Sequence, residues 1–413
     1  MSKLAVNIQR IEDDIYRLAK FGASEEGRGV TRQGFTAADW EARLWLKERF
    51  VELGLTTSID GAGNVCGRMG PGDKPAVVIT SHLDSVPAGG IFDGVLGVVA
   101  GMECVRVLKE NNIDLNFPIE IIATSEEEGR FGGMLGAQAL TGHVTLDWIE
   151  QAHDPSGQKL TDAMKSCGLD YRHALNAARR HESVKACIEL HIEQGPVLEA
   201  VDKTIGVVEG ISGVFKWMVR LVGKAGHAGT APMNLRSDAF MGLADFAHEI
   251  SRIIAEDGTD RSRLTIGFVE LKPGYAHTVP GNAEFTLVGR DMSEDVMRDI
   301  ADSCRKALSA IARAHGLMFE YEQMSWLPPS NMSTDVMKVI EEQTKELGYS
   351  YQVMPSGAGH DAQFFAQITP TGMIFIPSVA GVSHAPDEWS HWSDVEKGCN
   401  VLLHSVLVLA ESK

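Results

Sequence analysis

The most constraining feature of this sequence is a series of short, continuously apolar segments separated by stretches with helical periodicity. The runs AVVITSH (76–82), PIEIIATSE (118–126) and ACIELHIE (186–193) are rich in β-branched residues. Strands of this kind are buried on both faces, as in parallel sheets covered by helices. Residues 37–54 and 94–111 have the apolar spacing of helices. We therefore predict an α/β fold built on a mostly parallel sheet.

The middle of the chain follows a different pattern, in which strands and helices alternate in the order βαββαβ. That order is typical of a ferredoxin-like α+β unit. Glycine and proline interrupt the chain on both sides of it, at 209–213 and 326–331. We predict a catalytic domain over 1–211 and 328–413, with an inserted domain at 212–327. The six segments of the insert are 215–224, 237–256, 263–271, 283–291, 293–316 and 318–326.

The composition argues against several classes of protein. Lys and Arg number 38 and Asp and Glu 56, a net charge of −18, which disfavours nucleic acid or an anionic membrane as partner. No apolar run approaches the roughly 18–20 residues of a membrane helix, and the first residues lack the apolar core of a secretion signal. The six cysteines are scattered without a CxxC pair, which is typical of reduced thiols. We expect a cytoplasmic globular protein.

Acidic and imidazole side chains gather where the predicted strands end. His82 closes one strand, Asp84 follows it, and Asp93 lies in a glycine-rich loop. His191 and His384 lie at or just after two further strands. Ligands collect at the carboxyl ends of strands in open α/β sheets. Imidazole and carboxylate without thiolate suit Zn²⁺, Mn²⁺, Co²⁺ or Ni²⁺. A single such histidine would be a structural residue, whereas several strand ends together predict the metal site of a hydrolase.

The segment TSEEEGRFGG (124–133) adds three consecutive carboxylates. A solvated run of charges is the ordinary explanation of such a segment. Divalent cations between carboxylates would remove their mutual repulsion. Because neighbouring side chains on a strand point to opposite faces, Glu126, Glu127 and Glu128 cannot all serve one site. We expect a turn at the strand end to aim two of them at the metals.

The chain resembles the family of N-carbamoyl-L-amino acid hydrolases, allantoate amidohydrolases and β-ureidopropionases. Those enzymes are dinuclear metal amidohydrolases related to zinc aminoacylases and carboxypeptidases. The resemblance covers nearly the whole chain and implies a zinc-peptidase-like catalytic domain with an inserted lid and dimerisation domain. Its motifs, in chain order, are SHLDSV, FDG, EEEG, ELHIEQGPVLE, GHAGTAPMNLRSDA, SGAGHDAQ and SHAPDEW.

The resemblance also implies how the metals are held. Asp93 would bridge two divalent ions, and Asp84 would orient His82 with its carboxylate. A strained, often cis, peptide follows the bridging aspartate in the family, which here is the Asp93–Gly94 bond. The implied metal ligands are His82, Asp93, Glu128, His191 and His384.

Further roles follow from the same resemblance. Glu127 would be the general base toward the water that the metals activate. His227, on the insert, would reach the site of the partner subunit in a homodimer and stabilise the oxyanion. Arg290 would hold the carboxylate of a small-molecule substrate. The other implied substrate contacts are Gln194, His277, Ser356, Gly357 and Ala358.

Two departures from the family pattern leave the substrate open. Relatives read N-x-x-P-G where this chain has HTVPG, which puts His277 in the place of the asparagine. They also read E-E-G-S-R-F, whereas EEGRFGG lacks the serine. We predict hydrolysis of a linear amide C–N bond, with the N-carbamoyl group of a small carboxylic acid as the first choice. Allantoate, ureidoglycolate, β-ureidopropionate, N-acyl amino acids and dipeptides are the alternatives.

The segment GAGHDA (357–362) supports a remote rival function. It matches the G-x-G-x-x-A fingerprint of dinucleotide-binding proteins, which would make the chain an NAD-dependent oxidoreductase. However, it lies near the C-terminus, and no acidic residue follows about 20 positions later at a strand end. His360 and Asp361 are then either structural supports or substrate contacts. A serine hydrolase is weaker still, because the sequence has no G-x-S-x-G motif.

Overall fold

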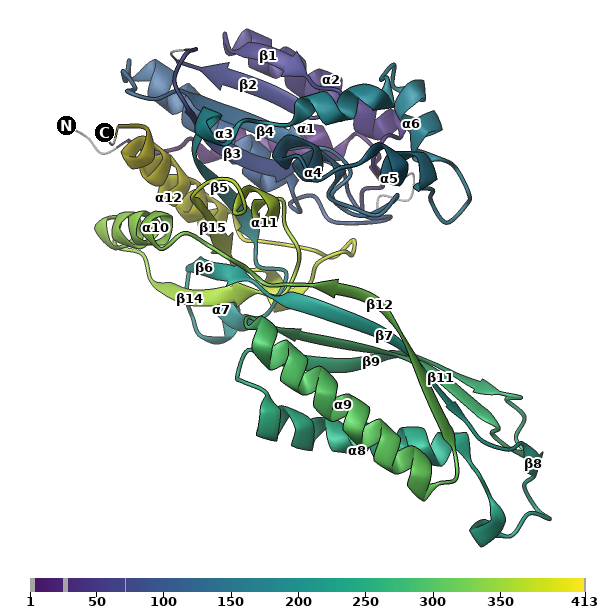
Figure 1. The fold of residues 1–413 in the computed structure, drawn as a ribbon. Coiled ribbons are helices and arrows are strands. Elements are labelled where there is room, and N and C mark those ends of the chain that lie inside the picture. The colour runs from purple at the N-terminus through teal and green to yellow at the C-terminus, as the bar shows by residue number, and fades with distance from the viewer. Residues whose placement is uncertain (1–3, 25–28, 71, 412–413) are drawn as a thin grey trace. The chain divides into compact units, whose positions relative to one another are not determined.

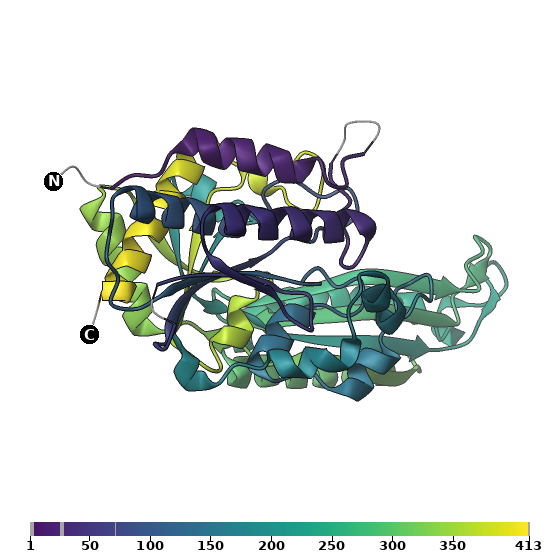
Figure 2. The same ribbon diagram turned by 90° about the horizontal axis from the view of Figure 1, so that it is seen from above.

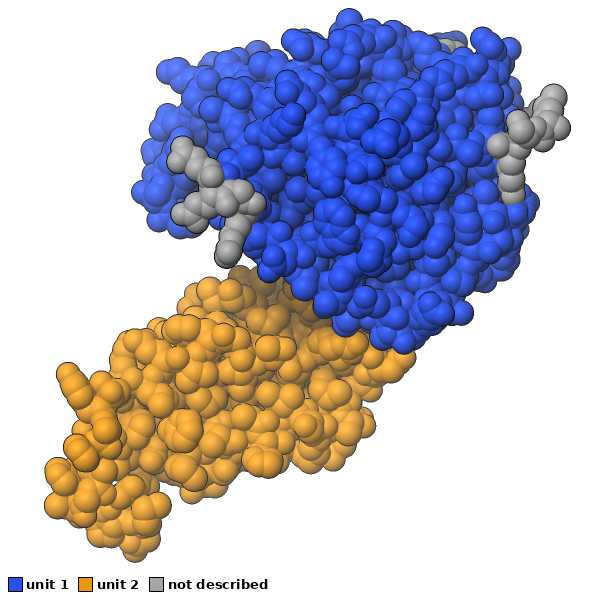
Figure 3. Space-filling view, turned by 180° about the vertical axis from the view of Figure 1, so that it is seen from behind, with its two compact units in different colours: residues 1–209, 331–413 blue, residues 210–330 orange. Residues whose placement is uncertain are grey.

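The chain divides into two compact units, which Figure 3 colours separately. Unit 1 comprises Met1–Glu209 and Asn331–Lys413, and unit 2 comprises Gly210–Ser330. The predicted insert of 212–327 occupies nearly the same stretch as unit 2. The computed structural model of the protein describes residues 4–24, 29–70 and 72–411.

The described part of unit 1 is built on a nine-stranded sheet, with strands in the order β1-β2-β4-β3-β5-β15-β6-β13 and β14 paired to β6 (Figure 1). β3 is parallel to both β4 and β5, and β15 is parallel to β5. β1, β2 and β6 flank this centre with antiparallel pairing. The α/β prediction is therefore confirmed. The strands are β1 Thr56–Ile59, β2 Val65–Met69, β3 Ala76–His82, β4 Ile119–Thr124, β5 Val184–Ile192, β6 Ile205–Ile211, β13 Ser330–Asn331, β14 Tyr351–Ser356 and β15 Thr371–Ile376.

The central strands are buried on both faces, as their continuous apolar sequence predicted. In β3 every residue is buried. Val77 and Ile79 face the large core, whereas Ala76 and Val78 face a smaller one. Side chains of a strand alternate between faces, so both sides of the sheet need helices to cover them.

Helices cover both faces of this sheet. The large core takes side chains from α1, α2, α3, α10 and α12, and the smaller core takes Leu140 of α4 and Phe365 of α11. Figure 2 shows α1 and α2, in dark purple, on one side of the sheet. None of the described helices is long and apolar enough to span a membrane. The helices of unit 1 are α1 Ile8–Ala19, α2 Ala37–Glu52, α3 Val95–Glu110, α4 Leu135–Thr141, α5 Leu146–Gln151, α6 Leu160–Ser166, α7 Val197–Ala200, α10 Thr334–Glu346, α11 Ala362–Phe365 and α12 Trp392–Glu411.

Unit 2 has the predicted order β7-α8-β9-β11-α9-β12, with a four-stranded antiparallel sheet in the spatial order β12-β7-β11-β9. Burial alternates along β7, and its inward residues, such as Phe215 and Trp217, join α8 and α9 in one core. This is the ferredoxin-like arrangement that the sequence predicted. The elements are β7 Gly213–Val222, β8 Gly226–His227, α8 Ala239–Asp257, β9 Arg263–Lys272, β10 Thr278–Val279, β11 Asn282–Asp291, α9 Glu294–Ala314 and β12 Met318–Leu327.

Candidate metal centre

Five side chains from separate parts of unit 1 meet at the carboxyl ends of the parallel strands. β3 ends on His82, β5 carries His191, and His384 lies in the loop after β15. Asp93 precedes α3, and Glu128 follows β4. Because β4, β3, β5 and β15 are neighbours in the sheet, segments that are far apart in sequence end close together.

Asp93 lies at the centre of this cluster and directs one carboxylate oxygen to each half. Its Oδ1 is 3.1 Å from His191 Nε2 and 3.4 Å from His82 Nε2. Its Oδ2 is 3.3 Å from His384 Nε2, which is also 3.3 Å from Glu128 Oε2. Two ligand groups result, His82–Asp93–His191 and Asp93–Glu128–His384, and within each the donor atoms lie within 4.8 Å of one another. A carboxylate shared in this way can bridge two ions.

The charges and donor atoms of the cluster suit divalent cations. Burial and the charge of Asp93 raise the pKa of Glu128 to about 7, although His82 and His384 oppose the shift. Burial, with the neighbouring acids, also raises the pKa of Glu127 well above its usual range. Buried acids that repel one another are stabilised by a cation between them. Glu128 Oε1 is buried without a hydrogen-bond partner, so it can still coordinate an ion.

The peptide bond after Asp93 is trans. Among the described residues, the cis peptide bond is Lys272–Pro273. The expectation from the resemblance that Asp93–Gly94 could be cis is therefore wrong. Gly94 instead takes a positive φ of 68°, which residues with a side chain rarely adopt. A Cβ on Gly94 would lie 2.4 Å from His82 Nδ1. Glycine therefore lets the chain turn into α3 directly against the His82 ring.

Backbone carbonyls set the orientation of both strand histidines. His82 Nδ1 is 2.9 Å from the carbonyl oxygen of Asp84, and His191 Nδ1 is 2.9 Å from that of Ile192. A carbonyl only accepts, so each Nδ1 donates to the backbone, and Nε2 is the ring atom that faces Asp93 and could hold an ion. The Asp84 carboxylate was expected to orient His82, but its Oδ1 is 4.0 Å from Nδ1. The backbone of Asp84 makes the contact instead.

The Asp84 carboxylate holds the glutamate segment. Its Oδ1 accepts the Glu127 N–H at 3.3 Å, and its Oδ2 accepts the Glu128 N–H at 3.2 Å. Behind it, Arg43 Nη2 lies 3.8 Å from Oδ1, and both side chains are buried. Asp84 thus fixes the backbone from which Glu127 and Glu128 reach the ligand groups. Nothing in the sequence marks Arg43 as a supporting residue, because an arginine on an amphipathic helix ordinarily faces solvent.

Glu126 turns away from the cluster. β4 ends at Thr124 rather than at Glu126, because Glu126 takes a left-handed φ of 56°. Its carboxylate accepts the Phe131 N–H at 2.5 Å and the Gly133 N–H at 3.0 Å. Glu126 therefore closes the glycine-rich turn, and it belongs to none of the candidate ligand groups of the described residues.

Gln194 lies beside the shared carboxylate. Its Nε2 donates to Asp93 Oδ2 at 2.9 Å and lies 3.2 Å from Ser383 Oγ. Its Oε1 is buried without a hydrogen-bond partner, so it has an acceptor to offer. Ser383 contacts the same carboxylate, and Glu388 contacts Ser383; neither was predicted from the sequence, although both belong to the SHAPDEW motif that carries His384.

The loop after β14 is bonded internally. Ser356 Oγ donates to the Ala358 carbonyl at 2.8 Å and accepts the Ala358 N–H at 3.1 Å. His360 is buried, with its Nε2 2.9 Å from Ser356 Oγ and its ring centroid 4.5 Å from that of His191. Asp361 is also buried and accepts from Thr124 Oγ1. The Ala358 N–H and both of these side chains therefore support the site from within.

The same segment does not form a dinucleotide-binding turn. The helix that follows it, α11, has only 4 residues, Ala362–Phe365. A dinucleotide site needs the N-terminus of a full helix and a glycine-rich backbone open to the pyrophosphate. The oxidoreductase alternative consequently loses its structural basis.

Unit 2 carries the remaining predicted residues. His227 ends β8 and pairs with Thr278 of β10. His277 directly precedes β10, and its carbonyl accepts the Ala228 N–H at 2.9 Å, so the two histidines lie near each other, and both are exposed. Arg290, on β11, is half-buried, and burial lowers the pKa of its guanidinium. All four candidate metal-ligand groups of the described residues lie in unit 1 instead.

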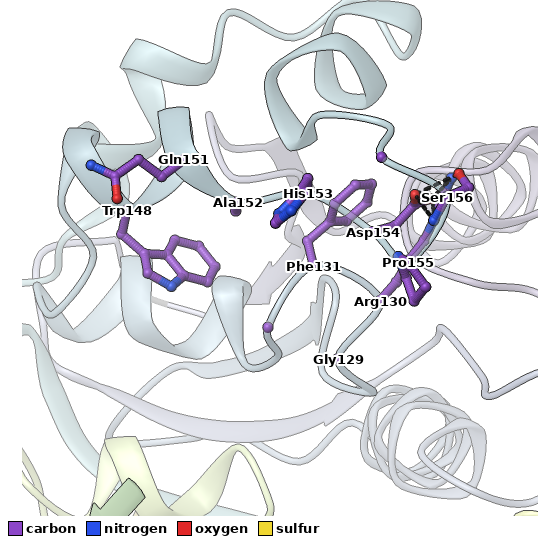
Figure 4. Close-up of a pocket in the computed structure, with 12 residues that line it drawn as sticks. Gly129, Arg130, Phe131, Trp148, Gln151, Ala152, His153, Asp154, Pro155 and Ser156 are labelled. Carbon is purple, nitrogen blue, oxygen red and sulfur yellow. Dashed lines mark hydrogen bonds and ion pairs between the residues drawn. The ribbon is translucent and has the colours of Figure 1, made fainter. Parts of the chain in front are cut away.

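A hollow of about 810 Å³ in unit 1 borders the glycine-rich turn (Figure 4). Gly129 and Phe131 line it on one side and Trp148 on another, whereas none of the five candidate metal ligands does. Arg130 in its wall donates through Nη2 to Asp154 Oδ2 at 3.0 Å. The guanidinium is thereby paired with an acid. The hollow is separate from the metal centre, and Arg130 braces the turn.

Comparisons with known proteins agree over nearly the whole chain. The model of peptidase family M20/M25/M40 matches residues 78–407. The N-carbamoyl-L-amino-acid amidohydrolase of Paenarthrobacter aurescens is 38% identical over 407 residues, which are 97% of this chain and 98% of that protein. The allantoate amidohydrolase of Escherichia coli (strain K12) is 34% identical over 409 residues, 98% of each.

A solved structure has the same fold throughout. An amidase of the hydantoinase/carbamoylase family from Burkholderia multivorans matches with a TM-score of 0.93 at 33% identity, and the match covers 98% of each chain. The similarity therefore spans the residues of both units.

Proposed function

Since the chain belongs to peptidase family M20/M25/M40, we propose that this metal-dependent amidohydrolase removes the N-carbamoyl (ureido) group of an amino acid or a related small carboxylic acid. The bond broken is a linear amide C–N bond, and the products are the free amine, CO₂ and ammonia. The observation that carries the proposal is the Asp93 carboxylate shared between two ligand groups. The name of the relative from Paenarthrobacter aurescens supports the choice of substrate.

Two divalent ions are the proposed cofactor. His82, Asp93 and His191 would hold one, and the group Asp93–Glu128–His384 would hold the other. Imidazole and carboxylate donors fit Zn²⁺, and equally Mn²⁺, Co²⁺ or Ni²⁺. When bound, such ions lower the pKa of a water molecule and polarise the carbonyl under attack.

Glu127 is the proposed general base. It is buried, and its Oε2 lies 3.8 Å from His82 Nε2, on the side of the ligand groups. Its backbone is held by the Asp84 carboxylate. A carboxylate fixed there can accept a proton from the attacking water and deliver it to the leaving nitrogen.

Unit 2 would supply contacts to the rest of the substrate. We propose a homodimer in which His227 serves the site of the other subunit and stabilises the oxyanion of the tetrahedral intermediate. An exposed imidazole on a short strand suits that task. Arg290 would bind the substrate carboxylate through two parallel N–H donors. His277, next to His227, would take the place of the family's asparagine.

Other groups of unit 1 would complete the substrate pocket. The unpartnered Oε1 of Gln194 is available to a donor on the substrate. The backbone of Gly357 would approach the substrate, with Ser356 shaping the loop and Ala358 held by it. Allantoate, ureidoglycolate, N-acyl amino acids and dipeptides are alternative substrates, because they carry the same kind of bond. A cytoplasmic location remains our expectation.

A screen of purified protein supplemented with Zn²⁺, Mn²⁺, Co²⁺ or Ni²⁺ tests the proposal. It measures released amine and ammonia from N-carbamoyl, N-formyl and N-acetyl amino acids, allantoate and dipeptides, with Glu127→Gln as the control. We expect the highest kcat/KM on an N-carbamoyl amino acid. A higher kcat/KM on allantoate or on a dipeptide would mean that this compound, rather than an N-carbamoyl amino acid, is the substrate.

A further inference from the structure

We propose that Glu388 is a positioning residue for the bridging carboxylate of Asp93, and that it governs how tightly the ions are held. It acts from behind Asp93, on the backbone and on a neighbouring hydroxyl, without touching the ions. The inference rests on the proposed two-metal function. Glu388 lies in unit 1, as do all the groups it contacts.

Glu388 fixes the backbone that carries Asp93. Its Oε1 accepts the Asp93 N–H at 3.1 Å and the Phe92 N–H at 3.2 Å. The residue is only 3% exposed, so these bonds form in a place that water does not reach. A buried carboxylate that receives two N–H donors holds them in a narrow range of positions. The direction of the Asp93 side chain is set accordingly.

Glu388 also competes with Asp93 for the hydrogen bond of the Ser383 hydroxyl. Ser383 Oγ lies 2.8 Å from Glu388 Oε2 and 3.2 Å from Asp93 Oδ2. A hydroxyl has one proton, so it can donate to only one of the two carboxylates. The shorter contact makes Glu388 the acceptor of the Ser383 hydrogen bond. Asp93 Oδ2, which already accepts from Gln194, is thereby spared a second hydrogen bond and keeps a lone pair for the ion that it would share with Glu128 and His384.

The surroundings are shaped to admit this carboxylate. A Cβ on Gly90 would lie 2.0 Å from Glu388 Oε1, so only glycine leaves room for it. On the other side, the Phe92 ring packs 5.3 Å from that of Trp389 and 5.2 Å from that of Trp392. Glu388 thus ties the loop of Asp93 to the loop that follows His384, two segments that contribute ligands to the same group.

The test compares Glu388→Gln with Glu103→Gln. Glu103 is also a fully buried glutamate of unit 1 that accepts a backbone N–H, from Asn7, but it contacts none of the candidate ligands. Glutamine at 388 would turn an N–H₂ group toward Ser383. The Ser383 hydroxyl would then donate its hydrogen bond to the Asp93 carboxylate instead. We expect the affinity for Zn²⁺, measured by competition with a chelator, to fall about 10- to 100-fold in Glu388→Gln alone. Glu103→Gln also weakens the ion pairs of Glu103 with Arg10 and Arg106, so it should lower the melting temperature while the affinity for Zn²⁺ stays at the wild-type value.

A second variant covers the case in which Glu388→Gln does not fold. Gly90→Ala displaces the Glu388 carboxylate without removing a polar group, and Gly72→Ala, at an open position, is its control. We expect Gly90→Ala to weaken Zn²⁺ binding as Glu388→Gln does. Wild-type affinity in a folded Glu388→Gln or Gly90→Ala protein would overturn the inference. A wild-type protein that binds no Zn²⁺ would instead overturn the proposed function.

Discussion

The two units hold their functional residues in different ways. In unit 1, His82, Asp93 and Glu127 are buried, and His82 Nε2 lies within 4 Å of both carboxylates. In unit 2, His227 is exposed, and Arg290 is half-buried on the face of a sheet. A buried cluster of acids and imidazoles is costly without cations, whereas an exposed imidazole such as that of His227 is open to a substrate. Changes in unit 1 should thus affect the metals or the chemistry, and changes in unit 2 should affect turnover or substrate binding with the metals retained.

The largest effect should come from the base in unit 1. Glu127→Gln removes the proton acceptor but keeps the shape of the side chain, so kcat should fall roughly 10³- to 10⁴-fold. Metal content, measured by elemental analysis, should stay at the wild-type value because Glu127 is not a proposed ligand. Activity close to wild type would show that another group accepts the proton.

His227→Ala should have the next largest effect, from unit 2. Loss of one oxyanion donor should lower kcat about 10²- to 10³-fold, while metal content stays unchanged. Elemental analysis beside steady-state kinetics checks both expectations. A fall in metal content would contradict the division of labour between the units.

Hybrid dimers extend the same comparison. When His227→Ala and Glu127→Gln proteins are mixed and reassembled, about half the dimers are hybrids, and each holds one site with both groups intact if the site is completed across the two-fold axis. About a quarter of the wild-type activity should therefore return. An inactive mixture would mean that each site is built within one subunit.

Arg290→Ala should act on substrate binding. Hydrogen bonds to a charged group contribute about 1.5–3 kcal/mol, so KM for carboxylate substrates should rise roughly 10- to 100-fold. Arg290→Lys keeps the charge but loses the paired donors, and it should recover part of the loss. An unchanged KM would place the carboxylate elsewhere.

Much of the fold was predictable because burial leaves a clear pattern. β3 was predicted at 76–82 and is Ala76–His82, because a strand buried on both faces has to be apolar throughout. The end of β4 was predicted too late. Ser125 and Glu126 were included in the strand, but Glu126 takes a left-handed φ, and its carboxylate accepts two backbone N–H groups. Such a choice depends on a turn that forms only in the folded chain.

The candidate site was predictable as a set of ligands but not as a set of supports. His82, Asp93 and His384 could be found because they are reactive residue types placed at strand ends. For Asp84 the sequence could not show that its backbone carbonyl accepts from His82 while its carboxylate accepts from the glutamate segment. Glu388 was missed, because nothing in a sequence shows which backbone N–H a distant carboxylate accepts.

The smallest predicted effect concerns Ser356, and it tests whether every polar group of unit 1 near the cluster takes part in the reaction. Its hydroxyl bonds to the backbone of Ala358 and to His360, so it supports the loop. Ser356→Ala should cost about 1 kcal/mol, a fall in melting temperature of roughly 2–4 °C, with kcat/KM changed only a few-fold. Ser405→Ala is the control, because Ser405 Oγ is buried without a hydrogen-bond partner and its loss should leave stability unchanged or improved. A tenfold or greater loss of kcat/KM in Ser356→Ala alone would mean that this hydroxyl contacts the substrate.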